Sequence, residues 1–182
     1  MNSRLIHFIG GAAGPWQISS MRAVAGEPLM PTSHLQLGPP AALAGNSGTW
    51  QLTGVMSNVR YAEKAERAAL ASVQAPLGRA EATCAALIPL RKSEAWWALA
   101  QDERRALFEQ QSHHTQTRLA YLPAVARQLY HSRDLGEPFD FLTWFEYAPA
   151  DEARFEELLT RLRSTPEWQY VDREIDIRLV RC

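Results

Sequence analysis

The sequence predicts an α+β fold with antiparallel sheets, in which the C-terminal part has the βαββαβ element order of a ferredoxin-like unit. Two observations support this prediction. Strand-like and helix-like runs alternate regularly over residues 81–182, and prolines or glycines separate them. The length of 182 residues suits one domain. We expect a reduced ferredoxin-like first half over residues 1–80 and a complete second half over residues 81–182.

The second half begins with a strand and two helical segments. Residues 82–90 are an apolar run that predicts a strand. Ser93 can start a short helix that contains Trp96 and Trp97. Asp102 is the predicted N-cap of a longer helix that runs towards residue 118.

A proline marks the end of this helical region. Pro123 disfavours a helical conformation for Leu122, so the chain should turn there. Residues 126–132 then predict a strand, and Gly136 followed by Pro138 predicts a turn.

Residues 139–147 predict the next strand of the sheet. One face would carry Phe141, Thr143, Phe145 and Tyr147, and the other Leu142, Trp144 and Glu146. Both faces hold bulky side chains, which is typical of a strand that is packed on two sides.

The last helix and strand have the clearest patterns. Pro149 can open a helix whose apolar stripe has helical spacing, and Pro166 stops it. The stripe consists of Phe155, Leu158, Leu159 and Leu162. Residues 171–180 alternate apolar and charged side chains, which predicts a half-buried antiparallel strand.

The first half is less regular. Strand-like runs at 4–9, 16–24 and 48–57 precede one predicted helix over 59–75. Residues 26–47 contain four prolines and three glycines and predict a long loop that is functional or wraps a partner subunit. Two such sheets could pack together or close into a barrel-like core.

Composition narrows the classes of function. The formal net charge is −1 and no basic block occurs, which disfavours binding to nucleic acid or to an anionic membrane. No apolar run reaches the roughly 18 residues of a membrane span, and we expect no signal peptide. Cys84 and Cys182 form no recognisable motif, which favours a reducing cytoplasm. We therefore expect a protein that acts on a small molecule or on itself.

An adjacent histidine pair is the first candidate for chemistry. Successive helix positions differ by about 100° in direction, so only one of His113 and His114 can face a given pocket. His114 shares a stripe with Leu107, which favours it only slightly. One imidazole can hold an iron whose in-plane ligands come from a porphyrin. Glu167 could accept a hydrogen bond from the second ring nitrogen, or be a surface charge.

Arg127 is the second candidate. It shares a strand face with Leu129 and His131, so its side chain can point into a cavity. A guanidinium remains positive at any working pH and can bind a small oxyanion. The alternative is a salt bridge at a strand edge.

The stretch from His113 to Tyr147, with R-L-A-Y-L-P and T-W-F-E-Y, resembles the core of the chlorite dismutases. Trp96 and Trp97 upstream and S-T-P-E-W-Q-Y-V downstream extend the similarity over most of residues 50–182. The sequence is most similar to the short, single-chain members that lack most of the N-terminal unit.

This resemblance implies decomposition of chlorite to chloride and dioxygen, with formation of the O–O bond, on heme b bound by the second half. It also implies a homodimer, and a role in detoxification in the cytoplasm. Two alternatives stay open. Coproheme decarboxylases have a similar fold but lack the distal arginine, so Arg127 weighs against them. A heme-binding or sensing protein without turnover is the other, because a fold alone does not establish an activity.

The resemblance further implies roles for individual residues. His114 would be the proximal ligand of the heme iron, with Glu167 as its hydrogen-bond partner. Arg127 would be the distal arginine, held inward by Gln74.

The remaining implied roles concern the walls of the heme site. Lys92 and Tyr61 would meet the heme propionates, and Trp96 would line the heme. Leu122, Thr143 and Phe145 would surround the open coordination position. Trp97 would lie near the subunit contact.

Overall fold

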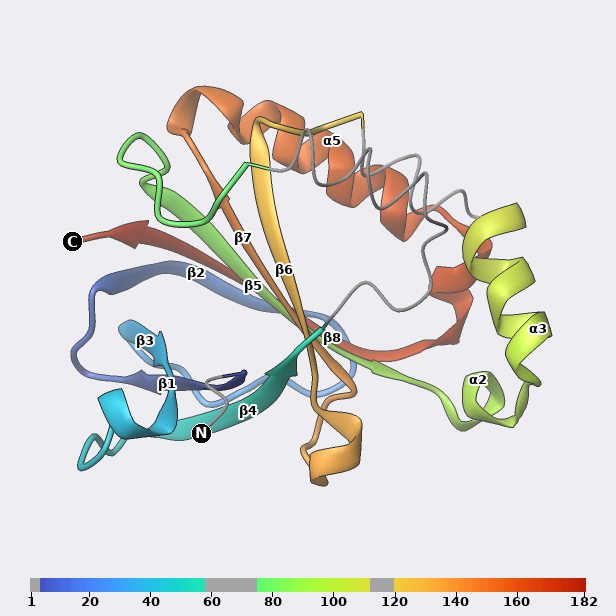
Figure 1. Ribbon diagram of the computed structural model, residues 1–182, viewed down its shortest axis with the longest axis horizontal. Coiled ribbons are helices and arrows are strands. Elements are labelled where there is room, and N and C mark those ends of the chain that lie inside the picture. The colour runs from blue at the N-terminus through green and yellow to red at the C-terminus, as the bar shows by residue number, and fades with distance from the viewer. Residues whose placement is uncertain (1–3, 58–74, 112–119) are drawn as a thin grey trace.

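A computed structural model of the chain describes residues 4–57, 75–111 and 120–182. In this part of the chain, eight strands form a closed antiparallel barrel in the order β1-β3-β2-β8-β5-β7-β6-β4 (Figure 1). The strands are β1 (Leu5–Gly11), β2 (Trp16–Ala25), β3 (His34–Gly38), β4 (Trp50–Met56), β5 (Cys84–Lys92), β6 (Val125–His131), β7 (Phe141–Tyr147) and β8 (Val171–Arg181). The predicted α+β class and the barrel are confirmed.

The helices follow the strands of the second half. They are α2 (Glu94–Ala98), α3 (Gln101–Arg105), the π-helical segment η2 (Ala106–Gln111) and α5 (Glu152–Arg163). Short 3-10 turns are η1 (Pro40–Ala42), η3 (Arg133–Leu135), η4 (Pro149–Asp151) and η5 (Pro166–Tyr170). In the described ranges, no helix is both long and apolar enough to cross a membrane.

Each half of the barrel has the strand order of a ferredoxin-like unit, in which the fourth strand pairs with the first and the third lies between the first and second. The second half reads β8-β5-β7-β6 and the first half β4-β1-β3-β2. The predicted long loop over 26–47 was wrong in part, because it contains β3. Leu35 of β3 is fully buried, and the strand pairs with both β1 and β2. The sequence did not indicate this strand, because it has only five residues and prolines and glycines surround it.

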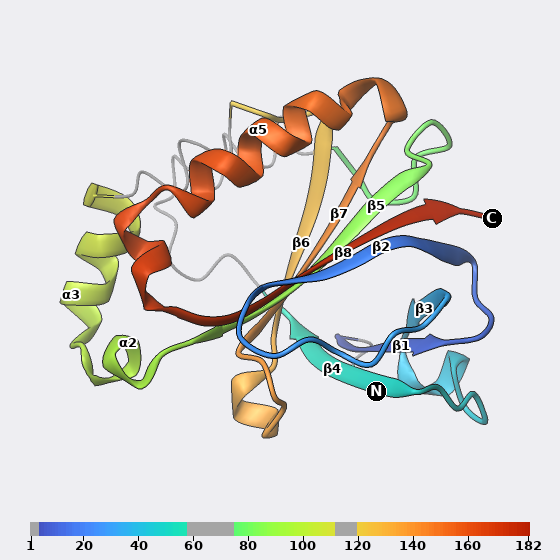
Figure 2. The same cartoon turned by 180° about the vertical axis from the view of Figure 1, so that it is seen from behind.

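Two seams join the halves, and they differ in length. β2 pairs with β8 from Trp16, opposite Arg181, to Ala25, opposite Glu174. Figure 2 shows these two strands crossing the barrel together. On the other side, the described ladder between β4 and β6 is short. It begins with the pair Val55 and His131, and its last hydrogen bond is donated by the Ser57 amide.

The sheet of the second half separates two hydrophobic cores, as the two bulky faces of β7 predict. Its inner face fills the barrel, where Trp144 lies against Phe8 and Trp16. Its outer face is covered by α5, and Phe155 of this helix contacts the rings of Phe145 and Tyr147 at 5.1 and 4.6 Å. All four residues of the predicted α5 stripe are buried.

The helical region after β5 begins as predicted but continues differently. Ser93 caps α2 and accepts a hydrogen bond from the Trp96 amide. The N-cap of α3 is Ala100 and not Asp102, because the Glu103 carboxylate accepts a hydrogen bond from the Ala100 amide at 2.7 Å. The predicted helix continues through η2 to Gln111, and its remainder from 112 to 118 lies outside the described residues. The predicted helix over 59–75 lies almost wholly outside them as well.

The prediction of β8 as a strand with a buried apolar face is confirmed, but the prediction that its other face is exposed was wrong at two positions. Glu174 and Asp176 have no exposed surface, because α5 and η5 cover the face that carries them. Arg163 of α5 pairs with both carboxylates at 2.6 and 3.0 Å. A buried charge needs such a partner, so this face is a buried ionic layer.

Candidate functional site

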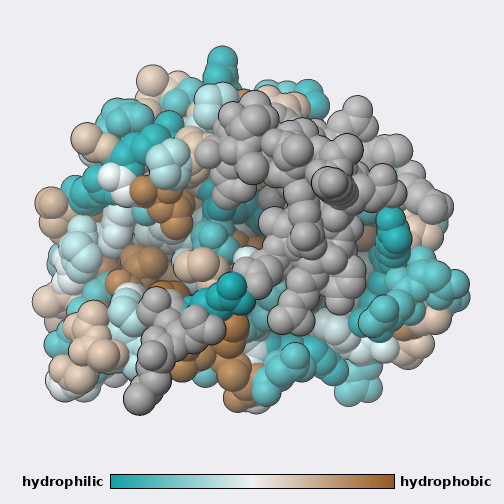
Figure 3. All heavy atoms as spheres, viewed as in Figure 1, coloured by the Kyte–Doolittle hydropathy of each residue, from teal (hydrophilic) through white to brown (hydrophobic). Residues whose placement is uncertain are grey.

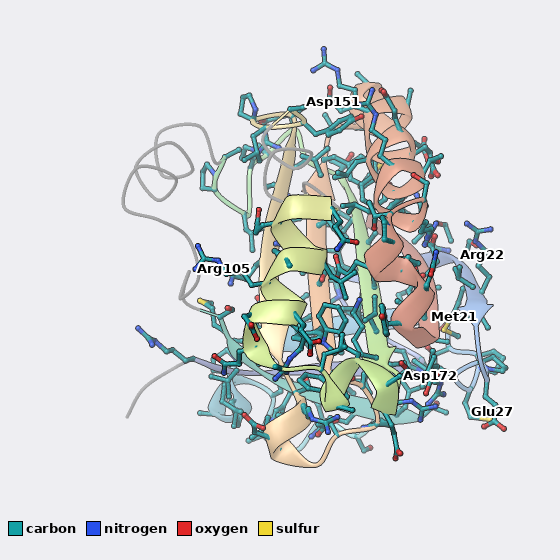
Figure 4. The ribbon with its side chains drawn as sticks, turned by 90° about the vertical axis from the view of Figure 1, so that its right-hand side faces the viewer. Met21, Arg22, Glu27, Arg105, Asp151 and Asp172 are labelled. Carbon is teal, nitrogen blue, oxygen red and sulfur yellow. The ribbon has the colours of Figure 1, made fainter. Side chains whose placement is uncertain are left out.

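The predicted site residues on strands β6 and β7 lie on the outer face of the sheet, which α5 covers in part. Figure 4 shows α3 and α5 standing in front of the strands on this side. Strand register places Arg127 of β6 opposite Phe145 of β7, and Leu129 opposite Thr143. These four residues therefore share one face, as the alternation of β6 predicted.

Coverage changes along this face. Phe145 is 3% exposed beneath α5, together with Ile88 of β5, which is 4% exposed. Arg127, Leu129 and Thr143 are only half-buried. The face thus offers a partly covered strip of apolar side chains, with one guanidinium beside it.

A buried ion pair lies near the end of β5. Lys92 is 4% exposed, and its ammonium lies 2.8 Å from Oε1 of Glu167 and 3.2 Å from the carbonyl oxygen of that residue. The rings of Trp96 and Trp168 lie 4.5 and 5.5 Å from the same ammonium. Burial lowers the pKa of Lys92 below its ordinary value, and the charge of Glu167 opposes this lowering.

This pairing was missed from the sequence, which assigned Lys92 and Glu167 to different partners. The surface alternative for Glu167 is excluded, because the residue is only 5% exposed in η5. A signal was present: Lys92 is the last residue of β5, a strand that is mostly apolar and buried. An ammonium in such a place requires a carboxylate partner.

Asp140 is a second buried carboxylate that the sequence did not indicate. It accepts hydrogen bonds from the Lys92 amide at 2.6 Å and from Trp97 Nε1 at 3.3 Å. The guanidinium of Arg133 pairs with it at 3.1 Å and lies 3.9 Å from the Trp97 ring centroid. Trp97 also stacks on Phe141 and is half-buried. Its neighbours within its own chain therefore fix its ring.

The other described candidates flank these groups. Trp96 is 7% exposed and packs against Tyr170 as well as Lys92. Leu122 is half-buried in the turn before β6 and is joined to Pro123 by a cis peptide bond. The remaining predicted residues, which are Tyr61, Gln74, His113 and His114, lie outside the described residues.

A surface depression of about 480 Å³ lies elsewhere, between β2 and residues 28–32. Figure 4 labels Met21 and Arg22 of its lining, at the side of the molecule away from α3. It contains none of the predicted site residues. The described ranges also hold no cluster of three or more histidine, cysteine or acidic side chains that could bind a metal ion.

Figure 3 shows the hydropathy of one face of the molecule. Hydrophobic residues gather over the N-terminal half of the barrel, and hydrophilic residues lie around them. The site on the second half is instead defined by strand register and by buried charges.

These features define a class of proteins in which two ferredoxin-like units close one barrel and a site lies on the outer face of the second unit. A family model described as chlorite dismutase matches residues 43–181. The chain belongs to the chlorite dismutase family of enzymes.

Individual relatives agree with this assignment. The crystal structure of dimeric chlorite dismutases from Nitrobacter winogradskyi is 60% identical, with a TM-score of 0.91, and the match covers 97% of this chain and 99% of that one. A chlorite dismutase from Ideonella dechloratans is 36% identical over 84 residues, which are 46% of this chain and 27% of that protein. A mutant chlorite dismutase from Candidatus Nitrospira defluvii shares the fold, with a TM-score of 0.69 at 20% identity. That match covers 100% of this chain and 93% of that one.

Proposed function

We propose that the protein binds heme b on the outer face of the second half and decomposes chlorite to chloride and dioxygen. The observation that carries this proposal is the position of Arg127. It lies on the outer sheet face, directly opposite Phe145, in a chain that is 60% identical to a chlorite dismutase.

The described residues fit a heme. The half-buried strip that includes Leu129 and Thr143 offers apolar contacts to a flat macrocycle, and Trp96 adds an aromatic wall. Glu167 offers a buried carboxylate, which is the group that best orients an iron-bound imidazole. When bound, the heme supplies the redox chemistry, and the protein supplies position and charge.

On the proximal side, we propose that His114 holds the iron and that Glu167 accepts the hydrogen bond from its second ring nitrogen. The ammonium of Lys92 lies 2.8 Å from Glu167, which favours the ionised carboxylate and fixes its position. We therefore propose that Lys92 acts through Glu167 and not on a propionate. Tyr61 remains our candidate for a propionate contact.

On the distal side, we propose that Arg127 binds the substrate anion, with Gln74 holding its side chain inward. The guanidinium keeps its charge at any working pH. Neighbouring apolar walls, to which Phe145 and Leu122 contribute, exclude water and strengthen the attraction. The same charge would retain a hypochlorite fragment beside the heme, whose redox chemistry would join the two oxygen atoms of chlorite and leave chloride and dioxygen as the products.

The test is oxygen evolution from heme-loaded protein after addition of chlorite. Arg127→Ala should lower turnover by about 10²-fold, the effect of losing one preorganised electrostatic group. It should also bleach faster, and a hypochlorite scavenger should collect product. Arg91→Ala is the matched control, because Arg91 is an exposed arginine of the same sheet, on β5, which β7 separates from β6. Equal bleaching of both variants, with nothing trapped by the scavenger, would contradict the role of Arg127.

The same preparation distinguishes the two alternatives. Formation of protoheme from coproheme and peroxide would identify a decarboxylase, and tight heme binding with neither reaction would identify a sensor. We also propose a homodimer, supported by the dimeric relative, with Trp97 near the contact. The composition supports the cytoplasm as its location.

A further inference from the structure

The buried face of β8 contains a carboxylate that no proposed step uses. Glu174 is 0% exposed. Its Oε1 accepts two hydrogen bonds from Arg163, at 2.8 and 2.6 Å, and its Oε2 accepts one from Trp168 Nε1 at 2.8 Å. Hydrogen bonds to a charged acceptor are the stronger kind. Glu174 therefore ties η5 to β8 and to the end of α5.

This tie is made next to the proximal group. Trp168 directly follows Glu167 in η5, a 3-10 turn of five residues. Such a short turn has poor hydrogen-bond geometry of its own and depends on contacts outside it. The Trp168 ring also lies 5.5 Å from the ammonium of Lys92, so this indole lies beside both members of the buried ion pair.

The carboxylates of this layer are paired with arginines, and one of these arginines is shared. Arg163 pairs with Glu174 and also with Asp176. Arg178 pairs with Asp176 from the other side. Glu174 is thus neutralised within the layer, which leaves Glu167 as the direct ion partner of the Lys92 ammonium. The hydrogen bond of Glu174 holds the indole beside the ion pair, and its charge also acts on the Lys92 ammonium, where it opposes the lowering of the pKa by burial.

We propose that Trp168 and Glu174 are positioning residues of the heme site. Their hydrogen bond fixes the place of the Glu167 carboxylate and, through it, the strength of the bond between the proximal imidazole and the iron. This inference rests on the proposed function. It adds a second tier of residues behind Glu167, the carboxylate proposed to accept a hydrogen bond from the imidazole.

The decisive variant is Trp168→Phe, which removes the N–H donor and keeps an aromatic ring near Lys92. Trp144→Phe is the matched control, because Trp144 is a buried indole that donates to the carboxylate of Glu146 at 2.9 Å inside the barrel. Both variants lose one indole–carboxylate hydrogen bond. They differ in whether that bond lies beside the proposed site.

The first measurement uses heme-free protein. An N-hydroxysuccinimide ester acylates lysine amines, and mass spectrometry reports the rate at Lys92. Because Lys64 and Lys92 are the lysines of the sequence, the labelled peptide is easily assigned. Trp168→Phe should raise this rate by about tenfold, the local opening expected when a hydrogen bond to a charged group is lost. Trp144→Phe should leave it near the wild-type rate.

The second measurement is the iron–imidazole stretching band of the heme-loaded ferrous protein in resonance Raman spectra. A loosely held carboxylate makes the imidazole less basic, so the band of Trp168→Phe should move to lower frequency, while that of Trp144→Phe should not. Equal labelling rates and equal bands in the two variants would overturn the inference. If Trp168→Phe does not fold, Glu174→Gln replaces it, with the same direction expected in both measurements. A protein that takes up no heme would refute the proposed function, while the labelling rates would still decide whether Trp168 positions the pair.

Discussion

Removing one member of the buried ion pair should destabilise the protein far more than removing both. Glu167→Ala leaves the Lys92 ammonium, whose side chain is 2% exposed, without the carboxylate at 2.8 Å. Breaking such a pair costs about 3–5 kcal/mol of unfolding free energy. The carbonyl oxygen of Glu167 at 3.2 Å and the Trp96 ring at 4.5 Å remain, so we expect the lower value. For a chain of this size, about 3 kcal/mol lowers Tm by roughly 6–12 °C.

The assay is urea-induced unfolding of heme-free protein at several pH values. In Glu167→Ala the pKa of Lys92 falls further below its ordinary 10.5, because burial lowers it and the opposing charge of Glu167 is gone. The unfolded chain then binds more protons than the folded chain between that lowered pKa and pH 10.5. Unfolding free energy therefore rises with pH in this window, and the deficit of the variant should shrink at alkaline pH.

The matched variant is Lys92→Met with Glu167→Leu, which replaces the pair by apolar side chains of similar volume. Its stability should return close to that of the wild type, since the two charges then leave the interior together. A loss below about 1 kcal/mol in Glu167→Ala is typical of a solvent-screened surface pair and would refute the reasoning. The reasoning would also fail if the double variant were no more stable than the single one.

Two further predictions concern residues on the strands of the barrel. Burial raises the pKa of Tyr130 and Tyr147 to about 12, so both phenols should keep their protons in the folded state when the unfolded chain has lost them. Unfolding free energy should then fall as pH rises from about 10 to 12, and a Phe substitution at both positions should flatten that fall in alkaline urea titrations. In Gly54→Ala the new Cβ would lie 2.7 Å from Cβ of Tyr130, and this close contact should cost about 1–3 kcal/mol of stability. Gly11→Ala is the control, because the nearest neighbour of its new Cβ is at 3.5 Å. Equal melting temperatures of the two variants would contradict the predicted cost at Gly54.

The sequence predicted most of the second half because each element there has a strong local pattern. The two bulky faces of residues 139–147 correspond to the two cores that β7 separates. β3 was missed because its five residues have too short a pattern, and its stability comes from pairing with β1 and β2. The N-cap of α3 was misplaced because it is decided by the side chain of Glu103, three residues after Ala100.

The candidate site was predictable in its chemistry but not in its pairings. Strand alternation alone placed Arg127 on a face with Leu129, and register adds Phe145 to that face. No local pattern can show that Lys92 and Glu167 meet, since 75 residues separate them. The burial of Glu174 was likewise hidden, because alternating charges predict an exposed face until the tertiary fold covers it.

The short ladder between β4 and β6 has a consequence for how the native barrel opens. Its described pairing spans little more than Val55 and Met56, whereas β2 and β8 are paired along most of their length. Native-state hydrogen exchange should therefore release the amides of this ladder at a lower free energy than those of the long seam. Such an opening turns β6 into an edge strand while the core between the sheet and α5 stays intact. Arg127 thus lies on a strand that borders one of the two shortest described ladders of the barrel, so opening of that ladder would expose the edge of its own strand.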